Sequence, residues 1–503
     1  MKGTRRTKGL TWVVLSAVFL GLMAIPALAK DTLTIANIYD ARSLDPIVQN
    51  EVAASGAICH INETLIDLDD EGNPIPLLAE EFEQIDPTTY RFVLRKGVKF
   101  HNGDPFTAAD VLYSIERAKS PLGSAIKQYP EIIESVVAED DYTVVIKIKY
   151  PFTPFWGTMA HTSLAVVNQR AVEEKGDMYP MNPVGTGPFT MKEWVKNDKL
   201  VLERFEEYWG DKPAYKTLVM RSVPESVNRT IELETGAVDI AYLIPTADVS
   251  RVKDNKDLNV ISAYQHSTCF MGFNTAKEPW NDPRVREAVK LALDINGARH
   301  AVFRGTGETP VSLVPKTIKY SDQSATMPKR DVERAKQLLA EAGVKLPLKA
   351  QIWSNAYKPR VDLAQIFQAQ LKEVGIEIEA KVLEWGAYLD GLKLGDHDMY
   401  ILGWTISSVD PDGIMSGIVH SGGGSNYAKF HDEEIDALID KGKTMPDGPE
   451  REALYMDLQK RLNEQNPYLY LYAEETFYGV KNEVENFIPS ARGYHNLAGV
   501  SFK

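Results

Sequence analysis

The residues best suited to chemistry in this sequence lie in the stretch Met399–Asp412, which reads MYILGWTISSVDPD. Its apolar start is typical of a buried strand, and the strand gives way to a polar loop that contains Ser407, Ser408 and Asp410. Trp404 stands at the junction and offers a large flat apolar surface with one N–H donor. The pattern favours a binding site for a small molecule, and its alternative is a core tryptophan followed by an ordinary turn.

Catalysis is the competing interpretation of the same loop. Asp410 and Asp412 are paired carboxylates of the kind that perform acid–base chemistry, as in an exported hydrolase. The sequence contains no Gly-x-Ser-x-Gly or His-Glu-x-x-His motif, and its nine histidines are scattered without metal-ligand spacing. We therefore expect a binding protein with no catalytic residue, no bound metal and no cofactor.

The elements upstream of the loop are expected to position it. Leu348–Trp353 and Ile376–Val382 alternate apolar and polar residues as strands do, and apolar residues recur at helical spacing between them. A short helical segment, Gly386–Leu394, then precedes the apolar run that begins at Met399. This β-α-β-α-β order with short connections predicts an α/β fold with a parallel, doubly wound sheet.

Aromatic residues follow each of these three strands. The strand ends lead into Trp353–Tyr357, Glu384-Trp385 and Trp404–Asp412. Because the carboxyl ends of parallel strands meet at one edge of a sheet, and ligands bind at that edge, we expect Tyr357 and Trp385 to line the site with Trp404.

Length and composition limit the class of protein. A chain of 503 residues with 44% hydrophobic and 25% charged residues is globular and too long for one core, so two or three domains are expected. The formal net charge of −14 argues against nucleic acid and anionic membranes as partners.

The first 29 residues are predicted to be a secretory signal peptide. Four basic residues open the chain, Leu10–Ile25 is apolar, and Ala27-Leu28-Ala29 is a small-x-small cleavage site before Lys30. The alternative is an uncleaved membrane anchor. In an exported protein, Cys59 and Cys269 form either one disulfide or two buried thiols, and the sequence leaves both open.

Two further segments predict local structure. Tyr90–Phe100 alternates around Lys96-Gly97 as a hairpin does. Thr107 and Asp110 form a capping-box-like helix start.

Four blocks of sequence resemble one known family. The blocks are Tyr90–Ala118, Asn182–Gly210 with Glu234–Ala241, Phe270–Asp294 and Leu383–Asp412. In this order they resemble the periplasmic oligopeptide/dipeptide-type solute-binding proteins of ABC importers, solute-binding family 5.

The resemblance implies a two-lobed periplasmic-binding-protein-like fold with a hinge and an extra subdomain. Lobe I would comprise 30–72, 182–267 and 480–503, the extra subdomain 73–181, and lobe II 268–479. It also implies a monomer in the periplasm that captures a small peptide or peptide-like solute and delivers it to the membrane permease of an ABC importer. Other members of the family bind sugars, opines, haem or metal complexes.

The family's two charged anchors for peptides are both replaced here. The aspartate that holds a peptide amine matches Ser407, and the arginine that holds a carboxylate matches the position of Ser354. Asp410 and Glu51 remain as candidates for a cation, and Arg360 for a carboxylate. Asn50 and Glu51 match a lobe I loop that touches ligand in the family. A neutral, polar or modified solute is therefore the alternative to a standard dipeptide.

Overall fold

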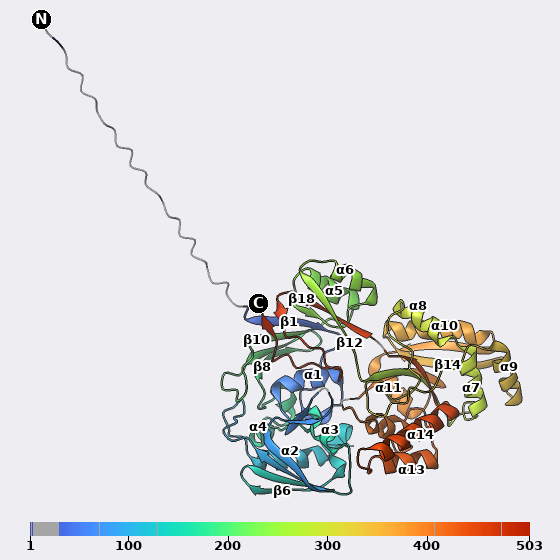
Figure 1. Cartoon of the computed structure of the whole chain (residues 1–503), viewed down its shortest axis with the longest axis horizontal. Helices are drawn as coiled ribbons and strands as arrows, with labels where there is room; N and C mark the ends of the chain where they lie inside the picture. The colour runs from blue at the N-terminus through green and yellow to red at the C-terminus, as the bar shows by residue number, and fades with distance from the viewer. Residues whose placement is uncertain (2, 4–29, 70, 128, 407, 474) are drawn as a thin grey trace.

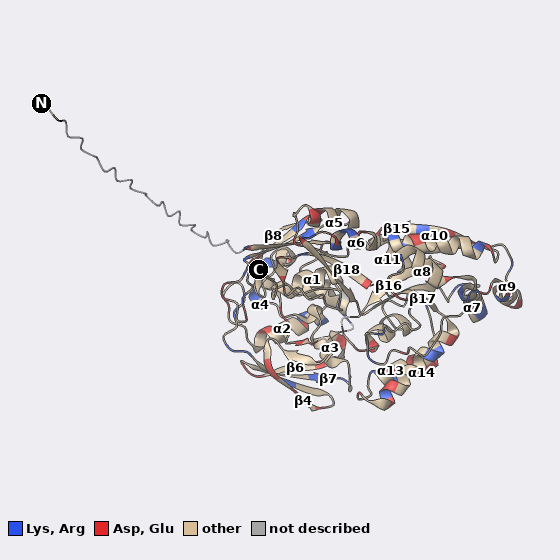
Figure 2. Cartoon of the chain, turned by 45° about the horizontal axis from the view of Figure 1, so that its top comes forward, with Lys and Arg blue, Asp and Glu red and all other residues tan. Residues whose placement is uncertain are grey.

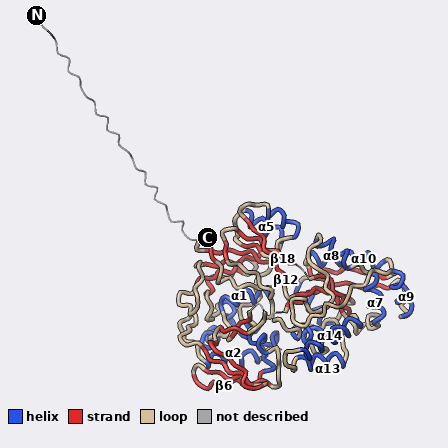
Figure 3. Tube along the Cα trace, in the orientation of Figure 1, coloured by secondary structure: helices blue, strands red, loops and turns tan. Residues whose placement is uncertain are grey.

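The computed structural model describes residues 1, 3, 30–69, 71–127, 129–406, 408–473 and 475–503. Almost all of the predicted signal peptide, and also Ser407, lie outside the described residues. The chain folds into an N-terminal half and a C-terminal half that lie beside each other, and the C-terminus returns to the N-terminal half (Figure 1). The predicted α/β class is confirmed, and each half is built on its own sheet (Figure 3).

The N-terminal half contains a seven-stranded mixed sheet with the order β12-β18-β11-β1-β10-β9-β8. The bounds are β1 Thr32–Asn37, β8 Phe189–Val195, β9 Lys199–Arg204, β10 Thr217–Ser222, β11 Ile240–Ala241, β12 Leu258–Tyr264 and β18 Glu475–Lys481. Strand β1 runs parallel to both β10 and β11. The helices α1 Val52–Ile61, α5 Ser226–Glu234 and α6 Val249–Lys253 pack against this sheet.

The extra subdomain is a four-stranded antiparallel sheet with the order β4-β5-β7-β6. Its elements are β4 Ala79–Asp86, β5 Thr89–Leu94, β6 Ile133–Asp140, β7 Thr143–Ile148, α2 Ala108–Lys119, α3 Phe155–Met159 and α4 Gln169–Lys175. The predicted capping box of Thr107 and Asp110 begins α2. The predicted hairpin over Tyr90–Phe100 is wrong, because β5 pairs with β4 and β7.

The C-terminal half contains a five-stranded sheet with the order β15-β14-β16-β13-β17. The bounds are β13 Ser267–Phe273, β14 Leu348–Asn355, β15 Ile376–Leu383, β16 Met399–Thr405 and β17 Tyr468–Tyr472. Strand β14 is parallel to β15 and to β16. The β-α-β-α-β order is thereby confirmed, with the helices α10 Lys358–Lys372 and α11 Trp385–Leu394 as its connections. The sheet as a whole is mixed and not parallel as predicted, because β13 runs antiparallel to both β16 and β17.

Two hydrophobic cores cover the two faces of this second sheet. One core includes buried residues of α10 together with α7 Pro283–Ala292, α8 Ile295–Phe303 and α9 Val332–Glu341. The other includes residues of α11 together with α13 Glu433–Gly442 and α14 Pro449–Gln465. The exposed faces of α13 and α14 bear charges of both signs, such as Arg461 between Glu434 and Asp457 (Figure 2).

The short remaining elements are β2 Ile66–Leu68, β3 Pro74–Pro76, α12 Asp412–Ile414, β19 Val484–Glu485 and β20 Ser501–Phe502. Two features bear on the expected division of the chain. Leu65 and Leu68, expected in lobe I, share a core with the extra subdomain. The expected boundary at 480 falls inside β18, which is a strand of the first sheet. The boundary therefore belongs before Glu475, because one strand cannot be divided between two lobes; the rest of the division stays a prediction.

The chain passes between the two sheets along a two-stranded ribbon. Strand β12 pairs antiparallel with β18 up to Tyr264 and Glu475, and β13 pairs antiparallel with β17 from Cys269 and Tyr472 onward. Both crossings therefore lie side by side, where a hinge between two lobes is expected. No helix among the described residues combines the length and apolar character needed to cross a membrane.

Candidate functional site

The strand ends of the second sheet form the centre of the candidate site. Strands β14 and β16 are paired only at Ile352–Met399 and Trp353–Tyr400 among the described residues, and they part beyond that point. Beyond that point the hydroxyl of Tyr388 in α11 donates to the carbonyl of Ile401 in β16 at 2.8 Å. The chain after β14 continues into α10 on one face, whereas the chain after β15 continues into α11 on the other. This is a topological switch point, where α/β sheets bind ligands.

Trp404 is the second-last residue of β16 and pairs with Thr268 of β13. Its ring is half-buried and packs against the core that α11 and α14 cover. A Cβ atom on Gly417 would lie 3.1 Å from the ring, so this glycine allows the indole to approach closely. Trp404 is therefore both a core residue and a candidate site residue, because part of its ring packs into the core and the rest remains accessible.

The binding loop, which we define as residues 406 and 408–412, lies against the N-terminal half. A Cβ atom on Gly157 of α3 would lie 2.8 Å from the Cβ of Ser408, and one on Gly72 would lie 2.0 Å from a methyl group of Val409. Gly72 also has a φ of +83°, which favours glycine. The two halves therefore touch through Ser408 and Val409, and glycine is required where they meet.

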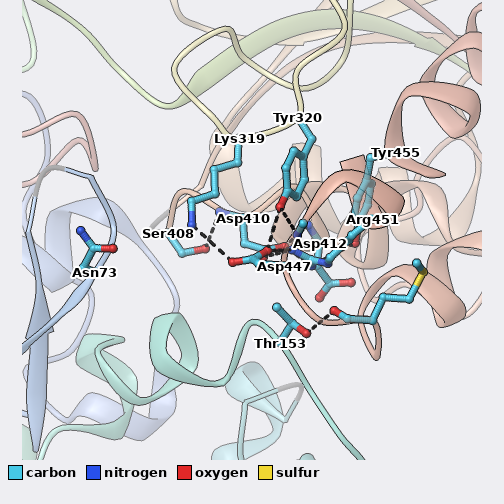
Figure 4. Close-up of polar contacts among 12 residues, drawn as sticks. Asn73, Thr153, Lys319, Tyr320, Ser408, Asp410, Asp412, Asp447, Arg451 and Tyr455 are labelled. Carbon is cyan, nitrogen blue, oxygen red and sulfur yellow. Dashed lines mark hydrogen bonds and ion pairs between the residues drawn. The ribbon is translucent and has the colours of Figure 1, made fainter. Parts of the chain in front are cut away.

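Further contacts join the two halves on either side of this loop. Thr153 of the extra subdomain donates its N–H to the carbonyl of Lys443 at 2.9 Å and its hydroxyl to the carbonyl of Met445 at 2.5 Å (Figure 4). Near the crossing strands, a Cβ atom on Gly493 would lie 3.3 Å from Val52 and 3.6 Å from Thr405. The structure is therefore closed, with the strand ends of the second sheet facing the first lobe.

Asp410 has a partner that its sequence neighbourhood does not reveal. Arg451 of α14 donates to its two carboxylate oxygens at 2.8 and 2.9 Å, and also to Asp447 at 2.8 Å. The Arg451 side chain is 0% exposed. The backbone N–H of Asp412 donates to Asp410 as well, at 2.9 Å. Both oxygens of Asp410 are thus engaged within its own lobe.

Asp412 is buried next to this ion pair. Burial, followed by the charge of Asp410, raises the pKa of Asp412 to about 6. Its carboxyl accepts a hydrogen bond from the hydroxyl of Ser416 at 2.5 Å. The two aspartates therefore differ in role, because Asp410 is paired with an arginine, whereas the raised pKa of Asp412 lets that residue take up a proton in mild acid.

The other aromatic candidates stand at the expected edge. Trp385 begins α11, is 37% exposed, and follows Glu384, whose carboxylate caps the helix. Tyr357 precedes α10 and is half-buried. Burial lowers the pKa of Arg229 of α5 to about 10, and Tyr357, from the other lobe, is among the groups that oppose this shift. Ser354, in contrast, is 1% exposed within β14.

The lobe I candidates precede α1. Asn50 is exposed, and Glu51 forms an ion pair with Arg42 at 3.0 Å. The next residue, Val52, shares the neighbourhood of Gly493 with Thr405. The fold therefore brings Asn50 and Glu51 near the end of β16, from the opposite lobe.

Arg360, which the sequence indicates as a candidate for a carboxylate, lies at the switch point. It stands in the first turn of α10, and its guanidinium donates to the side-chain oxygen of Asn355 at 3.0 Å. A Cβ atom on Gly403 would lie 2.7 Å from one of its nitrogens, so the glycine allows the guanidinium to approach β16. Its Nε is buried without a hydrogen-bond partner among the described residues. The guanidinium thus lies beside Gly403 of β16, with Asn355 at the end of β14 and Tyr472 of β17 as its hydrogen-bonding neighbours.

Both cysteines carry free thiols, and Cys269 is buried in β13. Among the described residues, no cluster of histidine, cysteine and carboxylate side chains is arranged to hold a metal ion. The geometry around Arg360 and Trp404 is suited to holding a solute by charge, stacking and lobe closure.

Comparison with known proteins identifies the family. Residues 73–426 match the model of the bacterial extracellular solute-binding proteins, family 5. The chain is 29% identical to the dipeptide-binding protein of Escherichia coli over 461 residues, covering 85% of this chain and 86% of that protein. It is also 29% identical to heme-binding protein A of Haemophilus influenzae, covering 85% and 84%.

A solved structure supports the same assignment. The periplasmic binding protein DppA from Helicobacter pylori, in complex with the peptide STSA, is 27% identical and superposes with a TM-score of 0.86, covering 94% of this chain and 98% of that one. These proteins bind solutes and are not enzymes, so the hydrolase alternative is set aside. The chain therefore belongs to the family 5 bacterial extracellular solute-binding proteins, and it has their two-lobed fold.

Proposed function

We propose that this protein captures a short peptide or peptide-like solute between its lobes and delivers it to the permease of an ABC importer. The dipeptide-binding relative and the neighbour crystallised with a tetrapeptide support this assignment. In this proposal residues 1–29 are removed on export, and the mature monomer acts in the periplasm. Two half-sites together bury a solute that neither lobe covers alone.

The position of Arg360 is the observation on which the proposal rests. Its guanidinium lies at the switch point beside Gly403, and the N-terminal end of α10 adds partial positive charge there. A peptide always ends in a carboxylate unless it is blocked, and arginine binds carboxylates through two parallel N–H donors. Arg360 would therefore take the place of the family's arginine, whose position is occupied here by the buried Ser354.

The remaining contacts would come from both lobes. Trp404, Tyr357 and Trp385 would cover the apolar surfaces of the solute, and Ser408 would offer a neutral hydroxyl. Ser407 would do the same, although it lies outside the described residues. Asn50 and Glu51 would close the site from lobe I. Asp410 would contribute through the shape of the loop, because Arg451 already occupies its oxygens.

The test is a binding screen on the mature chain. Native mass spectrometry would first show any solute that copurifies, and thermal shift would then compare Ser-Thr-Ser-Ala, its C-terminal amide, its N-acetyl form and haem. A ligand that binds only the folded state raises its melting temperature. We expect the free acid and the N-acetyl form to stabilise the protein more than the amide does. Stabilisation by haem alone would overturn the peptide assignment.

Trp404 is expected to contribute directly to the affinity for the solute. Replacing it with alanine should weaken binding of the stabilising peptide at least about tenfold, which corresponds to roughly 1.4 kcal/mol, because the solute loses a flat stacking surface. Isothermal titration calorimetry would measure the affinity, and circular dichroism would confirm the fold. Ile488→Ala, at an apolar side chain that is 74% exposed, is the control. An unchanged affinity in folded Trp404→Ala would remove this residue from the site.

A further inference from the structure

The binding loop is held from inside its own lobe by a buried arginine. Arg451 donates from Nε to the carbonyl of Gly442 at 2.7 Å, in addition to its bonds with Asp410 and Asp447. Its guanidinium also lies over the rings of Tyr320 and Tyr455, at 5.7 and 5.0 Å from their centroids. With its N–H donors engaged and two tyrosine rings beside it, this side chain has one well-defined position.

A second connection reaches the same loop from residues 319 and 320. The backbone N–H of Lys319 donates to the carbonyl of Val409 at 3.1 Å. The side chains of Lys319 and Tyr320 both bind Asp447, at 3.4 and 3.0 Å (Figure 4). Asp447 thus joins this segment to Arg451, and the two connections hold the loop at Val409 and at Asp410.

The opposite side of the loop is the surface that the N-terminal half meets. Ser408 and Val409 approach Gly157 and Gly72 so closely that a side chain at either glycine would collide with them. Contacts of this kind tolerate little change in the position of the loop. The Arg451 side chain itself is 0% exposed, so it acts on the loop through its partners, directly through Asp410 and indirectly through Asp447.

We propose that Arg451 is a positioning residue, which fixes the binding loop through Asp410 in the shape that receives both the solute and the other lobe. This inference deepens the proposed function and rests on it for the role of the loop in solute binding. In this proposal the charge of Asp410 holds the loop in its shape through Arg451 and does not bind the solute. The loop would accordingly offer the solute neutral hydroxyl and peptide groups in place of a free carboxylate.

The experiment separates the position of the loop from the identity of the ligand. Hydrogen–deuterium exchange of the ligand-free mature protein would be followed in segments covering 406–415 and, as an internal reference, 358–372. Three variants are compared with wild type: Asp410→Asn, Arg451→Lys and Arg451→Met. Arg461→Met is the matched control, because Arg461 lies on the same helix and pairs only at its surface.

We expect exchange over 406–415 to be at least about tenfold faster in Asp410→Asn, with the reference segment unchanged. Arg451→Lys should give a smaller increase, since lysine keeps the charge but not the paired donors. Arg451→Met leaves two carboxylates without their partner, and should the chain fail to fold, Asp410→Asn still decides the question. If folded Asp410→Asn exchanges over the loop at the same rate as wild type, the proposal is overturned.

Affinity provides the functional part of the test, with Ser-Thr-Ser-Ala as the probe. Asp410→Asn should bind it at least tenfold more weakly than wild type, while Arg461→Met binds normally. If wild type does not bind this peptide, the proposed function fails and the exchange data alone decide whether Arg451 positions the loop. Faster exchange together with wild-type affinity would show that the loop is held by Arg451 but that binding does not need it, which would also overturn the proposal.

Discussion

Replacing Arg360 with methionine is expected to weaken binding of a peptide with a free carboxylate at least about thirtyfold, or roughly 2 kcal/mol. The expected size is the lower end of the effect seen when one member of a desolvated charge pair is removed. Methionine has a similar length and fills the space beside Gly403 without charge. Calorimetric titration of wild type and variant with Ser-Thr-Ser-Ala would measure the change.

The decisive comparison uses the C-terminal amide of the same peptide. Wild type should prefer the free acid, and Arg360→Met should bind acid and amide about equally, because the group that distinguishes them is gone. Arg334→Met provides a control at an exposed arginine of α9. If Arg360→Met keeps the preference for the free acid, another residue holds the carboxylate and the role assigned to Arg360 is wrong.

The second large effect concerns stability, at the buried Glu63. Its carboxylate accepts hydrogen bonds from Tyr208 at 2.7 Å, Thr186 at 2.8 Å and Trp209 at 2.9 Å. These donors favour the charged form, but burial outweighs them and raises the pKa of Glu63 to about 7 from an ordinary value of 4.5. The folded state therefore holds a proton on Glu63 in a range of pH where the unfolded chain has released it.

The sign of the pH effect follows from this difference. Between pH 8 and pH 5 the folded state binds more protons at Glu63 than the unfolded state does, so this residue adds stability as the pH falls. Urea unfolding of wild type and Glu63→Gln at both values would measure it. The free energy of unfolding of wild type, relative to the variant, should be about 2 kcal/mol larger at pH 5 than at pH 8.

Glu207→Gln is the matched control for this measurement, because Glu207 is an exposed carboxylate that pairs with Lys99. It should show almost no such change between the two values of pH. A difference between wild type and Glu63→Gln that does not vary with pH would mean that the three donors keep Glu63 ionised throughout.

The sequence predicts the core of the second lobe well, and the reason is local. In α10 and β15 the buried residues recur at the period of the element itself, and β14 and β16 contain runs of four buried residues, as buried strands do, so type and order can be inferred from neighbouring residues. Tyr90–Phe100 shows the limit of that reasoning. Its alternation correctly indicates a strand at β5, but the partners of β5 are Ala79–Asp86 and Thr143–Ile148, and alternation does not encode a partner.

The candidate site shows the same limit more sharply. The sequence predicts that Tyr357, Trp385 and Trp404 meet at one edge, since parallel strands require it. It does not predict that Asp410 is paired with Arg451, which lies 41 residues further along the chain. An ion pair between distant elements has no characteristic spacing, so a carboxylate in a binding loop is easily taken for a ligand contact when it is a structural one.

The ribbon that joins the two sheets also determines the order in which the protein can be assembled. The second sheet, from β13 to β17, is complete once Tyr472 has been synthesised. The first sheet is not, because β18 is its second strand and lies between β12 and β11. In the chain, β12 comes before the whole C-terminal lobe and its neighbour β18 comes after it, so the first sheet cannot be completed before residues 475–481 are present. Residues 475–481 then enter as an interior strand, and a chain truncated before them would lack the strand that joins β12 to its sheet.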